Sequence, residues 1–348
     1  MRRGISFIKS HQLARFRSPL CGFSEVEQLI EIRTDPLTGE RCRINIERTK
    51  RPKQSPAESA ELRRTVEESR RNCFFCPQCI EDKTPKLPAE LGERIRVGRA
   101  IVFPNLFPFG AFHAVGVFSE DHYLSLHEFP ADMMADCFSA CVQYFTSVSR
   151  LDPSRRFWHI SWNYMQPAAS SIIHPHVQIL AEPLPTPHLE ELMERSREYH
   201  GRHGSNYWAD LVEAEMKGGE RYIGRTGRVH WLASYAPRAS REVMGIVEGS
   251  SSLAQVGGDL HDLCDGLSRV LRGYHEMGVR SMNFTTFSGP FDESISDFYW
   301  LNVRVISRPA PAPFHISDCG FMERLHLEPV IEVMPEDVAA SLRTQFGP

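Results

Sequence analysis

Two histidines and a glutamine at alternate positions are the residues of this sequence best suited to chemistry. His174, His176 and Gln178 stand in the largely apolar run 172–180. In a strand, alternate side chains share one face, and Pro175 would hold the backbone extended just before His176. A histidine can anchor one ring nitrogen and use the other to attack phosphorus or bind a metal, while a glutamine amide can hold a phosphate oxygen without supplying a proton. A single buried histidine is usually a core residue, but two at this spacing favour chemistry.

A cluster of cysteines lies a hundred residues earlier. Cys73, Cys76 and Cys79 fall within one short segment of a chain that has nine cysteines. The spacing of Cys73 and Cys76 can bring two thiolates onto one tetrahedral ion, although redox pairs share it. No second pair stands at a distance, so histidines are expected to complete a metal site.

The best placed histidines are His122, which follows a predicted strand, and His174, with Cys79 as an alternative ligand. A mixture of thiolate and imidazole favours zinc, and four protein ligands would make the site structural. If His174 is a ligand, the metal would fix the strand that presents His176. The alternative is that both histidines bind one ion, as in metal hydrolases.

Length and charge limit the classes of protein that the sequence can encode. At 348 residues the chain predicts two domains or one duplicated unit, and its net charge of −4 argues against a nucleic-acid-binding protein. No apolar run approaches the roughly 20 residues that span a bilayer, which argues against an integral membrane protein. The start lacks a secretory signal and the cysteine number is odd, so we expect a cytoplasmic location.

The elements that would position these residues occur twice. The apolar patterns predict a hairpin over 30–46, after a loosely held arm of about 25 residues, and an exposed linker over 53–70. They then predict strands at 101–107, 113–118, 157–163 and 172–180, with a helix at 130–149 between the second and the third. The same order of strands and helix is predicted at 228–235, 242–247, 260–277, 281–287 and 298–305, after a mostly helical segment over 187–219 and before a closing helix at 336–345.

This repetition predicts an internal duplication in which only one half is catalytic. The strand of the second half that corresponds to the histidine strand carries Trp300, Asn302 and Arg304 instead.

The motifs together resemble the galactose-1-phosphate uridylyltransferases and related nucleotidyltransferases of the histidine-triad superfamily. They stand in the order of that family: its amino-terminal signature at 33–40 and 48–52, its zinc knuckle at 73–77, its first nucleotide-contacting strand at 103–107, its third zinc ligand in 118–122, and its catalytic signature in Asn163, 168–171 and 174–178. The likeness covers about residues 27–308 and is most specific from 73 to 180.

The resemblance implies an α+β fold of duplicated histidine-triad-like units, in which antiparallel sheet forms a half-barrel with flanking helices. We expect a catalytic unit over 27–185, a second unit without the catalytic histidines over 220–345, and a homodimer. By position, the implied catalytic residues are His176, Gln178 and Ser171, the substrate-binding residues are Arg48, Asn105 and Asn163, and the ligands of Zn²⁺ are Cys73, Cys76, His122 and His174.

The implied reaction is a double displacement on a nucleoside diphosphate sugar. His176 would attack the α-phosphorus, expel a sugar 1-phosphate and hold the nucleotide until a sugar 1-phosphate or phosphate accepts it. Gln178 stands where hydrolytic members of the superfamily have a third histidine, which fits transfer better than hydrolysis.

The carboxyl-terminal segment departs from the family pattern. Phe321 and Met322 are followed by Glu323, Arg324, Leu325 and His326, where the sugar-recognising segment of the family has a tyrosine and a glutamate. The acceptor therefore stays open, and so do three alternatives: a nucleoside diphosphate sugar phosphorylase, a zinc-dependent phosphoester hydrolase, and a non-catalytic protein that binds nucleotide sugars.

Overall fold

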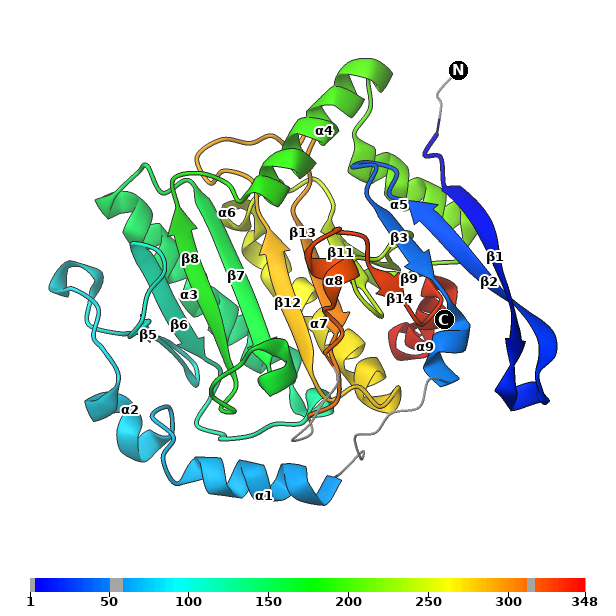
Figure 1. Ribbon diagram of the computed structural model, residues 1–348. Helices are drawn as coiled ribbons and strands as arrows, with labels where there is room; N and C mark the ends of the chain where they lie inside the picture. Colours follow the sequence, from blue (N-terminus) through cyan, green and yellow to red (C-terminus); the bar gives the residue numbers. More distant parts are fainter. Residues whose placement is uncertain (1–3, 51–58, 312–316, 348) are drawn as a thin grey trace.

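The computed structural model describes residues 4–50, 59–311 and 317–347, and these form one large and one small sheet (Figure 1). The large sheet has ten strands, and each neighbouring pair is antiparallel. In spatial order its strands are β4 (Ile95–Val97), β5 (Ala100–Pro104), β6 (Phe112–Val117), β8 (His176–Glu182), β7 (Phe157–Tyr164), β12 (Met282–Phe287), β13 (Asn302–Ser307), β11 (Val243–Val247), β10 (Val229–Ala233) and β9 (Tyr222–Thr226).

The strand order is mirrored about the β7–β12 pair. Going outwards from this pair, each half has first two strands that come after the long helix of that half in the sequence. Three strands that come before that helix in the sequence then follow. The predicted α+β class and duplicated antiparallel unit are therefore confirmed, and the two halves share one continuous sheet. The boundaries 27–185 and 220–345 stay a prediction.

Two long helices cover one face of the large sheet. These are α3 (Ala131–Leu151) and α7 (Leu260–Glu276), which pack on each other and on the strands (Figure 1). Along β7 the burial alternates, and its fully buried side chains, including Ile160 and Trp162, belong to the same apolar cluster as Phe138 and Phe145 of α3. Strand alternation and helical periodicity thus agree on one core, as the sequence predicts.

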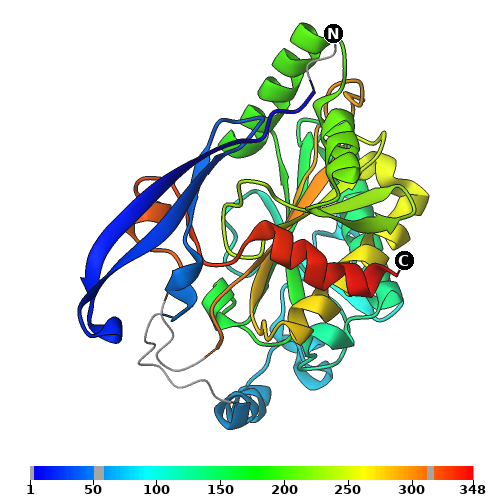
Figure 2. The ribbon, with the colours of Figure 1, turned by 90° about the vertical axis from the view of Figure 1, so that its right-hand side faces the viewer.

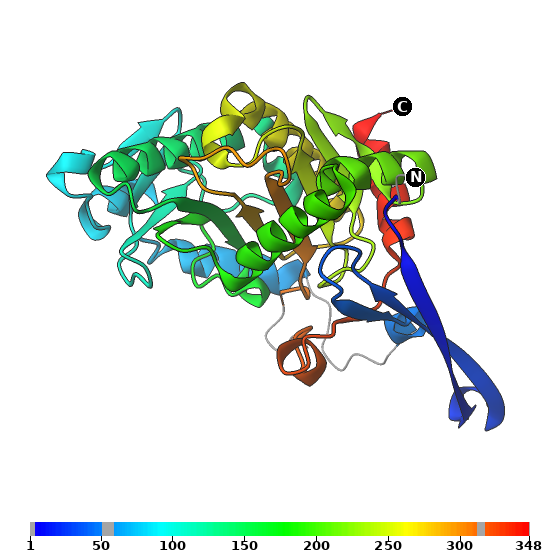
Figure 3. The same cartoon turned by 90° about the horizontal axis from the view of Figure 1, so that it is seen from above.

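The opposite face differs between the halves. In the second half, α4 (Pro187–His203) and α5 (Tyr207–Gly218) cover it, and Figure 3 shows α4 and α7 on opposite sides of the strands. Trp208 of α5 belongs to a cluster with Leu232, Met244 and Ile246 of β10 and β11. In the first half, the same face carries the polar side chains of β6, β8 and β7 described below.

The amino-terminal residues form a hairpin rather than the loose arm expected. β1 (Ile8–Ser18) pairs with β2 (Ser24–Thr34) over its whole length, and β3 (Arg41–Ile44) and β14 (Val330–Ile331) complete a four-stranded sheet. Figure 2 shows the β1–β2 hairpin extending away from the large sheet. Almost every residue of β1 is exposed, so no apolar alternation marks the strand in the sequence.

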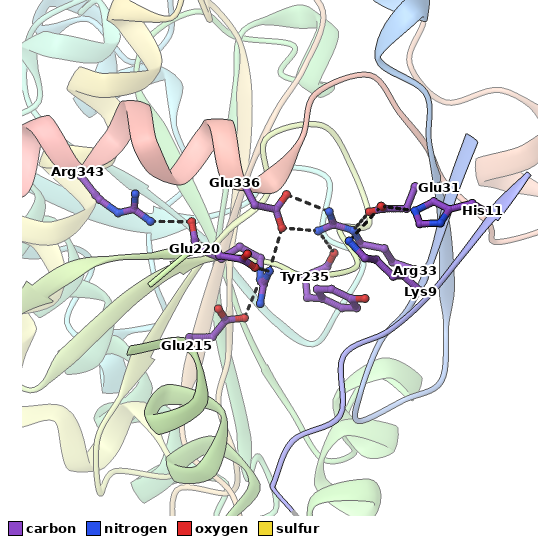
Figure 4. A network of polar contacts seen from close by, with 10 residues as sticks. Lys9, His11, Glu31, Arg33, Glu215, Glu220, Tyr235, Glu336 and Arg343 are labelled. Carbon is purple, nitrogen blue, oxygen red and sulfur yellow. Dashed lines mark hydrogen bonds and ion pairs between the residues drawn. The ribbon is translucent and has the colours of Figure 1, made fainter. Parts of the chain in front are cut away.

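A buried ionic network joins the small sheet to the rest of the molecule (Figure 4). Arg33, 1% exposed, donates to Glu31 at 2.5 Å and to both carboxylate oxygens of Glu336 at 2.9 and 3.0 Å. Arg221 bridges Glu336 to the fully buried Glu215. Burial would raise the pKa of Glu336, but the hydrogen bonds from the two arginines outweigh burial and leave that pKa below its ordinary value.

The closing helix α9 (Pro335–Phe346) confirms the helix expected at 336–345. Residues 59–70 of the expected linker form a helix, and residues 53–58 lie outside the described part of the chain. The other helices are α1 (Ser59–Arg70), α2 (Pro77–Lys83), α6 (Leu253–Val256) and α8 (Phe321–Arg324), with 3-10 turns η1 (Pro19–Cys21), η2 (Ile46–Lys50), η3 (Ala89–Leu91), η4 (Leu126–Glu128), η5 (Gln166–Ala168) and η6 (Gly257–Asp259). Among the described helices, none has the length and apolar character needed to cross a membrane.

Two strands begin later than predicted. β8 starts at His176, so His174 lies in the loop before it, and β13 starts at Asn302 rather than at 298. Residues 298 and 299 form a turn in which both backbone amides donate to the carbonyl of Ile295. Trp300 therefore stands outside the strand on which the sequence pattern placed it.

Candidate functional site

Four buried side chains from distant parts of the chain form a candidate metal centre. They are Cys73, Cys76, His122 and His174, and one donor atom from each lies within 4.8 Å of all the others. The Sγ of Cys76 lies 3.3 Å from Nδ1 of His122 and 3.7 Å from Nδ1 of His174, whose Nδ1 is 3.6 Å from Sγ of Cys73. Zinc–sulfur and zinc–nitrogen bonds at tetrahedral angles give a sulfur–nitrogen separation of about 3.5 Å. The spacing therefore fits one tetrahedral ion.

Local structure helps to orient three of the four candidate ligands. Cys76 caps the amino end of α2, with Pro77 as the first helical residue, whereas Cys79 is only partly buried and outside the quartet. The outer Nε2 atoms of His122 and His174 lie 2.8 Å from Ser69 Oγ and from the Ser119 carbonyl oxygen. For His174, the Nε2–H donates to that carbonyl, so the lone pair of Nδ1 faces the sulfurs.

The protonation of the cluster suits a cation. Burial lowers the pKa of His174 to about 4, so its imidazole is neutral near pH 7. Burial, followed by the nearby sulfur of Cys73, raises the pKa of the Cys76 thiol to about 12. A bound cation would reverse that cost, because metal-bound thiols are deprotonated. The quartet could therefore bind a metal, and its two sulfur and two nitrogen donors are typical of zinc or iron–sulfur sites.

His176 is the first residue of β8, and its ring is fixed by backbone. Its Nδ1 lies 2.8 Å from the carbonyl oxygen of His174, to which the N–H donates, so the lone pair belongs to Nε2. The residue is 8% exposed, and the ring of Phe75 packs edge-on at 5.2 Å. Burial lowers the pKa of His176, which favours the neutral nucleophilic form.

Gln178 and Asn105 are brought together by a third residue, His113. On β8, Gln178 pairs with Val115 of β6 and Ser161 of β7. Its Oε1 lies 3.0 Å from Nε2 of His113, and Nδ2 of Asn105 lies 3.2 Å from the same atom. We did not predict a role for His113, although a histidine that opens the apolar run 113–118 was a signal for one.

Asn163 lies where the two halves of the sheet meet. Its Oδ1 accepts a hydrogen bond of 2.8 Å from Asn283 of β12, the residue directly opposite. Asn283 also donates to the Ala168 carbonyl at 2.9 Å and accepts from Arg308 at 2.8 Å. The second half of the sheet thus contributes Asn283 and Arg308 to the hydrogen bonds around Asn163. The sequence analysis missed both residues because these contacts depend on strand pairing between the halves.

The last two predicted site residues, Ser171 and Arg48, lie in different parts of the structure. Ser171 is exposed in the loop that enters β8, where Met165 and Ala169 have φ angles of 69° and 67°. Such left-handed residues cost on the order of 1–3 kcal/mol and are frequent at functional sites. Arg48 lies instead in η2, next to the small sheet, with Nε 3.9 Å from a carboxylate oxygen of Glu332. The neighbouring signature residues 51 and 52 lie outside the described part of the chain.

Comparisons with known proteins identify relatives of this chain and structures that share its fold. No protein-family model matches the chain. A protein of Archaeoglobus fulgidus, described as uncharacterized, is 30% identical over 340 residues, which are 97% of this chain and 98% of that protein. The crystal structure of an ADP-glucose phosphorylase from Arabidopsis thaliana with bound ADP-glucose superposes with a TM-score of 0.72 at 20% identity, over 90% of this chain and 98% of that one.

A uridylyltransferase structure superposes with a TM-score of 0.65 at 17% identity, over the same shares of the two chains. A uridylyltransferase-like protein from Arabidopsis thaliana gives 0.68 at 18% identity, again over 90% and 98%. The chain therefore belongs to the same family as the Archaeoglobus fulgidus protein, and it has the fold of the galactose-1-phosphate uridylyltransferase-like proteins of the histidine-triad superfamily.

Proposed function

We propose that this protein is a nucleotidyltransferase that moves a nucleoside monophosphate from a nucleoside diphosphate sugar to a phosphate acceptor through a covalent bond to His176. The observation that supports this function most directly is the anchoring of His176. Its Nδ1–H donates to the His174 carbonyl, so a neutral ring presents the lone pair of Nε2. Gln178, two residues along the same strand, supplies an amide for the transferred phosphate.

The reaction would proceed in two displacements. Nε2 of His176 attacks the α-phosphorus, a phosphorus–nitrogen bond forms, and the bond from phosphorus to the bridging oxygen breaks. The sugar 1-phosphate leaves with that electron pair and needs little protonation, so a glutamine suffices at position 178. An oxygen of the acceptor phosphate then attacks phosphorus and releases the neutral imidazole.

We further propose that Zn²⁺ is held by Cys73, Cys76, His122 and His174. With four protein ligands, the ion would leave no open position and would serve to stabilise the fold. Because His174 is a ligand and its carbonyl holds His176, the metal site would fix the ring that reacts. This arrangement disfavours a zinc-dependent hydrolase, which needs an open position on the metal.

The acceptor is a sugar 1-phosphate or inorganic phosphate. The carboxylate of Glu323 accepts hydrogen bonds from the backbone amides of Gly320 and Val330, so both of its oxygens are already used within the protein. Because this glutamate is then not free to bind a sugar, the contact favours inorganic phosphate as the acceptor. The fold likeness to an ADP-glucose phosphorylase is a second argument for inorganic phosphate. A phosphorylase is therefore the second candidate. A homodimer and a cytoplasmic location stay predictions from the sequence.

Intact-protein mass spectrometry tests the proposal. The protein is mixed with UDP-glucose, ADP-glucose or GDP-mannose and quenched within seconds. We expect a mass increase of one nucleoside monophosphate, which His176→Ala abolishes. His230→Ala is the matched control, because His230 is a buried histidine of β10 in the other half of the sheet.

Other outcomes would change the assignment. Release of nucleotide into water without an adduct would favour a hydrolase, and binding without turnover would indicate a non-catalytic protein. When an adduct forms, its discharge by glucose 1-phosphate or by inorganic phosphate separates the two acceptors.

A further inference from the structure

His113 occupies a position on β6 from which its ring reaches the predicted catalytic strand. It pairs with Leu180 of β8, so Gln178 is its diagonal neighbour on the same face, within reach of long side chains. Its Nε2 lies 3.0 Å from Oε1 of Gln178, and its Nδ1 lies 3.3 Å from the backbone nitrogen of Phe109. The ring of Phe109 packs on the imidazole at 4.2 Å between centroids. His113 itself is 3% exposed, whereas Phe109, which covers its ring, is an exposed residue.

The backbone amide of Phe109 decides which ring nitrogen carries the proton. A backbone N–H can only donate, so Nδ1 of His113 must accept, and the proton of the neutral ring is then on Nε2. Burial lowers the pKa of His113, which keeps the ring neutral near pH 7. The donor at Nε2 needs an acceptor, and Oε1 of Gln178 is suitably placed.

The neighbouring asparagine does not compete for this proton. Oδ1 of Asn105 accepts from the backbone N–H of Phe107 at 2.9 Å, so its NH₂ group is the part that faces His113. Two donors cannot bond to each other. Asn105 and His113 are therefore in contact without a hydrogen bond, and the Nε2–H of His113 donates to Gln178.

We propose that His113 is a positioning residue that holds the Gln178 amide with its NH₂ group available to the transferred phosphate. This inference rests on the proposed function. With Oε1 held by His113, the NH₂ group is the part of the amide left to bind a phosphate oxygen. The flipped amide would instead present a carbonyl oxygen to the negative charge that develops there. The preorganised donor stabilises the transition state without rearrangement.

A double-mutant cycle tests the coupling. The nucleotidyl adduct at His176 is followed in single-turnover reactions of His113→Phe, Gln178→Ala and the double variant, across nucleotide-sugar concentrations. We expect His113→Phe to slow adduct formation about 10- to 100-fold with little change in the half-saturating concentration. In the Gln178→Ala background the same change should have an effect of less than about twofold, because the group through which His113 acts is gone. Multiplicative effects would overturn the proposal.

Two further variants separate positioning from stability. His113→Gln keeps an N–H donor at similar reach and should restore most of the rate lost in His113→Phe. His230→Phe removes a buried imidazole from the other half of the sheet and should leave the rate unchanged. Failure of His113→Gln to recover the rate while it remains folded would contradict the role of the donor.

A measurement without nucleotide distinguishes failure of this inference from failure of the proposed function. Nitrogen-15 NMR of the resting protein should show His113 protonated at Nε2, and the NH₂ resonance of Gln178 should shift in His113→Phe. Protonation at Nδ1, or an unmoved Gln178 resonance, would overturn the positioning role. Absence of any adduct in the wild-type protein would refute the proposed function, while the NMR result still decides the orientation of the amide.

Discussion

Replacing Arg33 by methionine is expected to lower the free energy of unfolding by about 3–5 kcal/mol at pH 7. The guanidinium is almost fully buried and makes four hydrogen bonds, one to Glu31, two to Glu336 and one to the Tyr235 carbonyl at 3.2 Å. Methionine fills a similar volume, so the loss comes from two carboxylates deprived of a partner inside the protein. Removal of one member of a buried ion pair typically costs this amount.

The cost of Arg33→Met should depend on pH. Hydrogen bonds from Arg33 help to hold the pKa values of Glu31 and Glu336 below the ordinary value of 4.5, against the opposite effect of burial. A carboxyl with a lowered folded-state pKa stabilises the fold above its unfolded-state pKa, and this stabilisation is lost as the pH falls through the folded-state value. The substitution should therefore cost most near neutral pH and progressively less below about pH 4.5.

Urea unfolding of both proteins between pH 3 and pH 7 measures this difference. Arg41→Met is the matched control, because Arg41 lies in the small sheet with its side chain 60% exposed and 3.3 Å from Glu328. A surface pair of this kind contributes at most about 1 kcal/mol. Equal losses for Arg33→Met and Arg41→Met, or a loss that does not shrink in acid, would refute the role given to the buried network.

Three further outcomes are expected. Cys76→Ser should abolish the one zinc ion per chain measured by plasma mass spectrometry, whereas Cys79→Ser should keep it; equal zinc contents would contradict the ligand set. Ser69→Ala should weaken zinc binding about 10- to 100-fold in a chelator competition, because it removes the group that orients a ligand imidazole, and unchanged affinity would show that the contact is dispensable. Gly266→Ala should destabilise the protein by about 1–3 kcal/mol in urea, because the new methyl group overlaps the Trp231 indole; any gain in stability would mean that the better helix propensity of alanine wins.

The residues of the metal quartet could be predicted from the sequence, because two local spacings indicate most of them. Cys73 and Cys76 stand either side of one turn, and His174 is two residues before His176, directly ahead of Pro175. Their residue types allow few alternatives, since thiolate and imidazole together favour zinc. The long elements were predicted for a similar reason, because α3 and β7 each bury one face and therefore show a clear period.

What the sequence left open depends on pairing between distant segments. The role of His113 follows from its place diagonal to Gln178 on the neighbouring strand, and Asn283 acts through its pairing with Asn163 from the other half. Arg48 was assigned by its place in a motif, and the structure puts it in η2, beside Glu332 and next to the small sheet. Neither a motif nor a periodicity reports such neighbours, because they arise only when the sheet assembles.

The pairing of β7 with β12 has a consequence for any attempt to produce the halves separately. A fragment that ends before residue 220 would leave the outer edge of β7 without its hydrogen-bonding partner, along a strand that also carries Trp158 and Trp162. Unprotected edges of this kind recruit strands from other molecules. We therefore expect the first half made alone to aggregate or to self-associate through β7, and co-expression of the second half to restore a soluble protein.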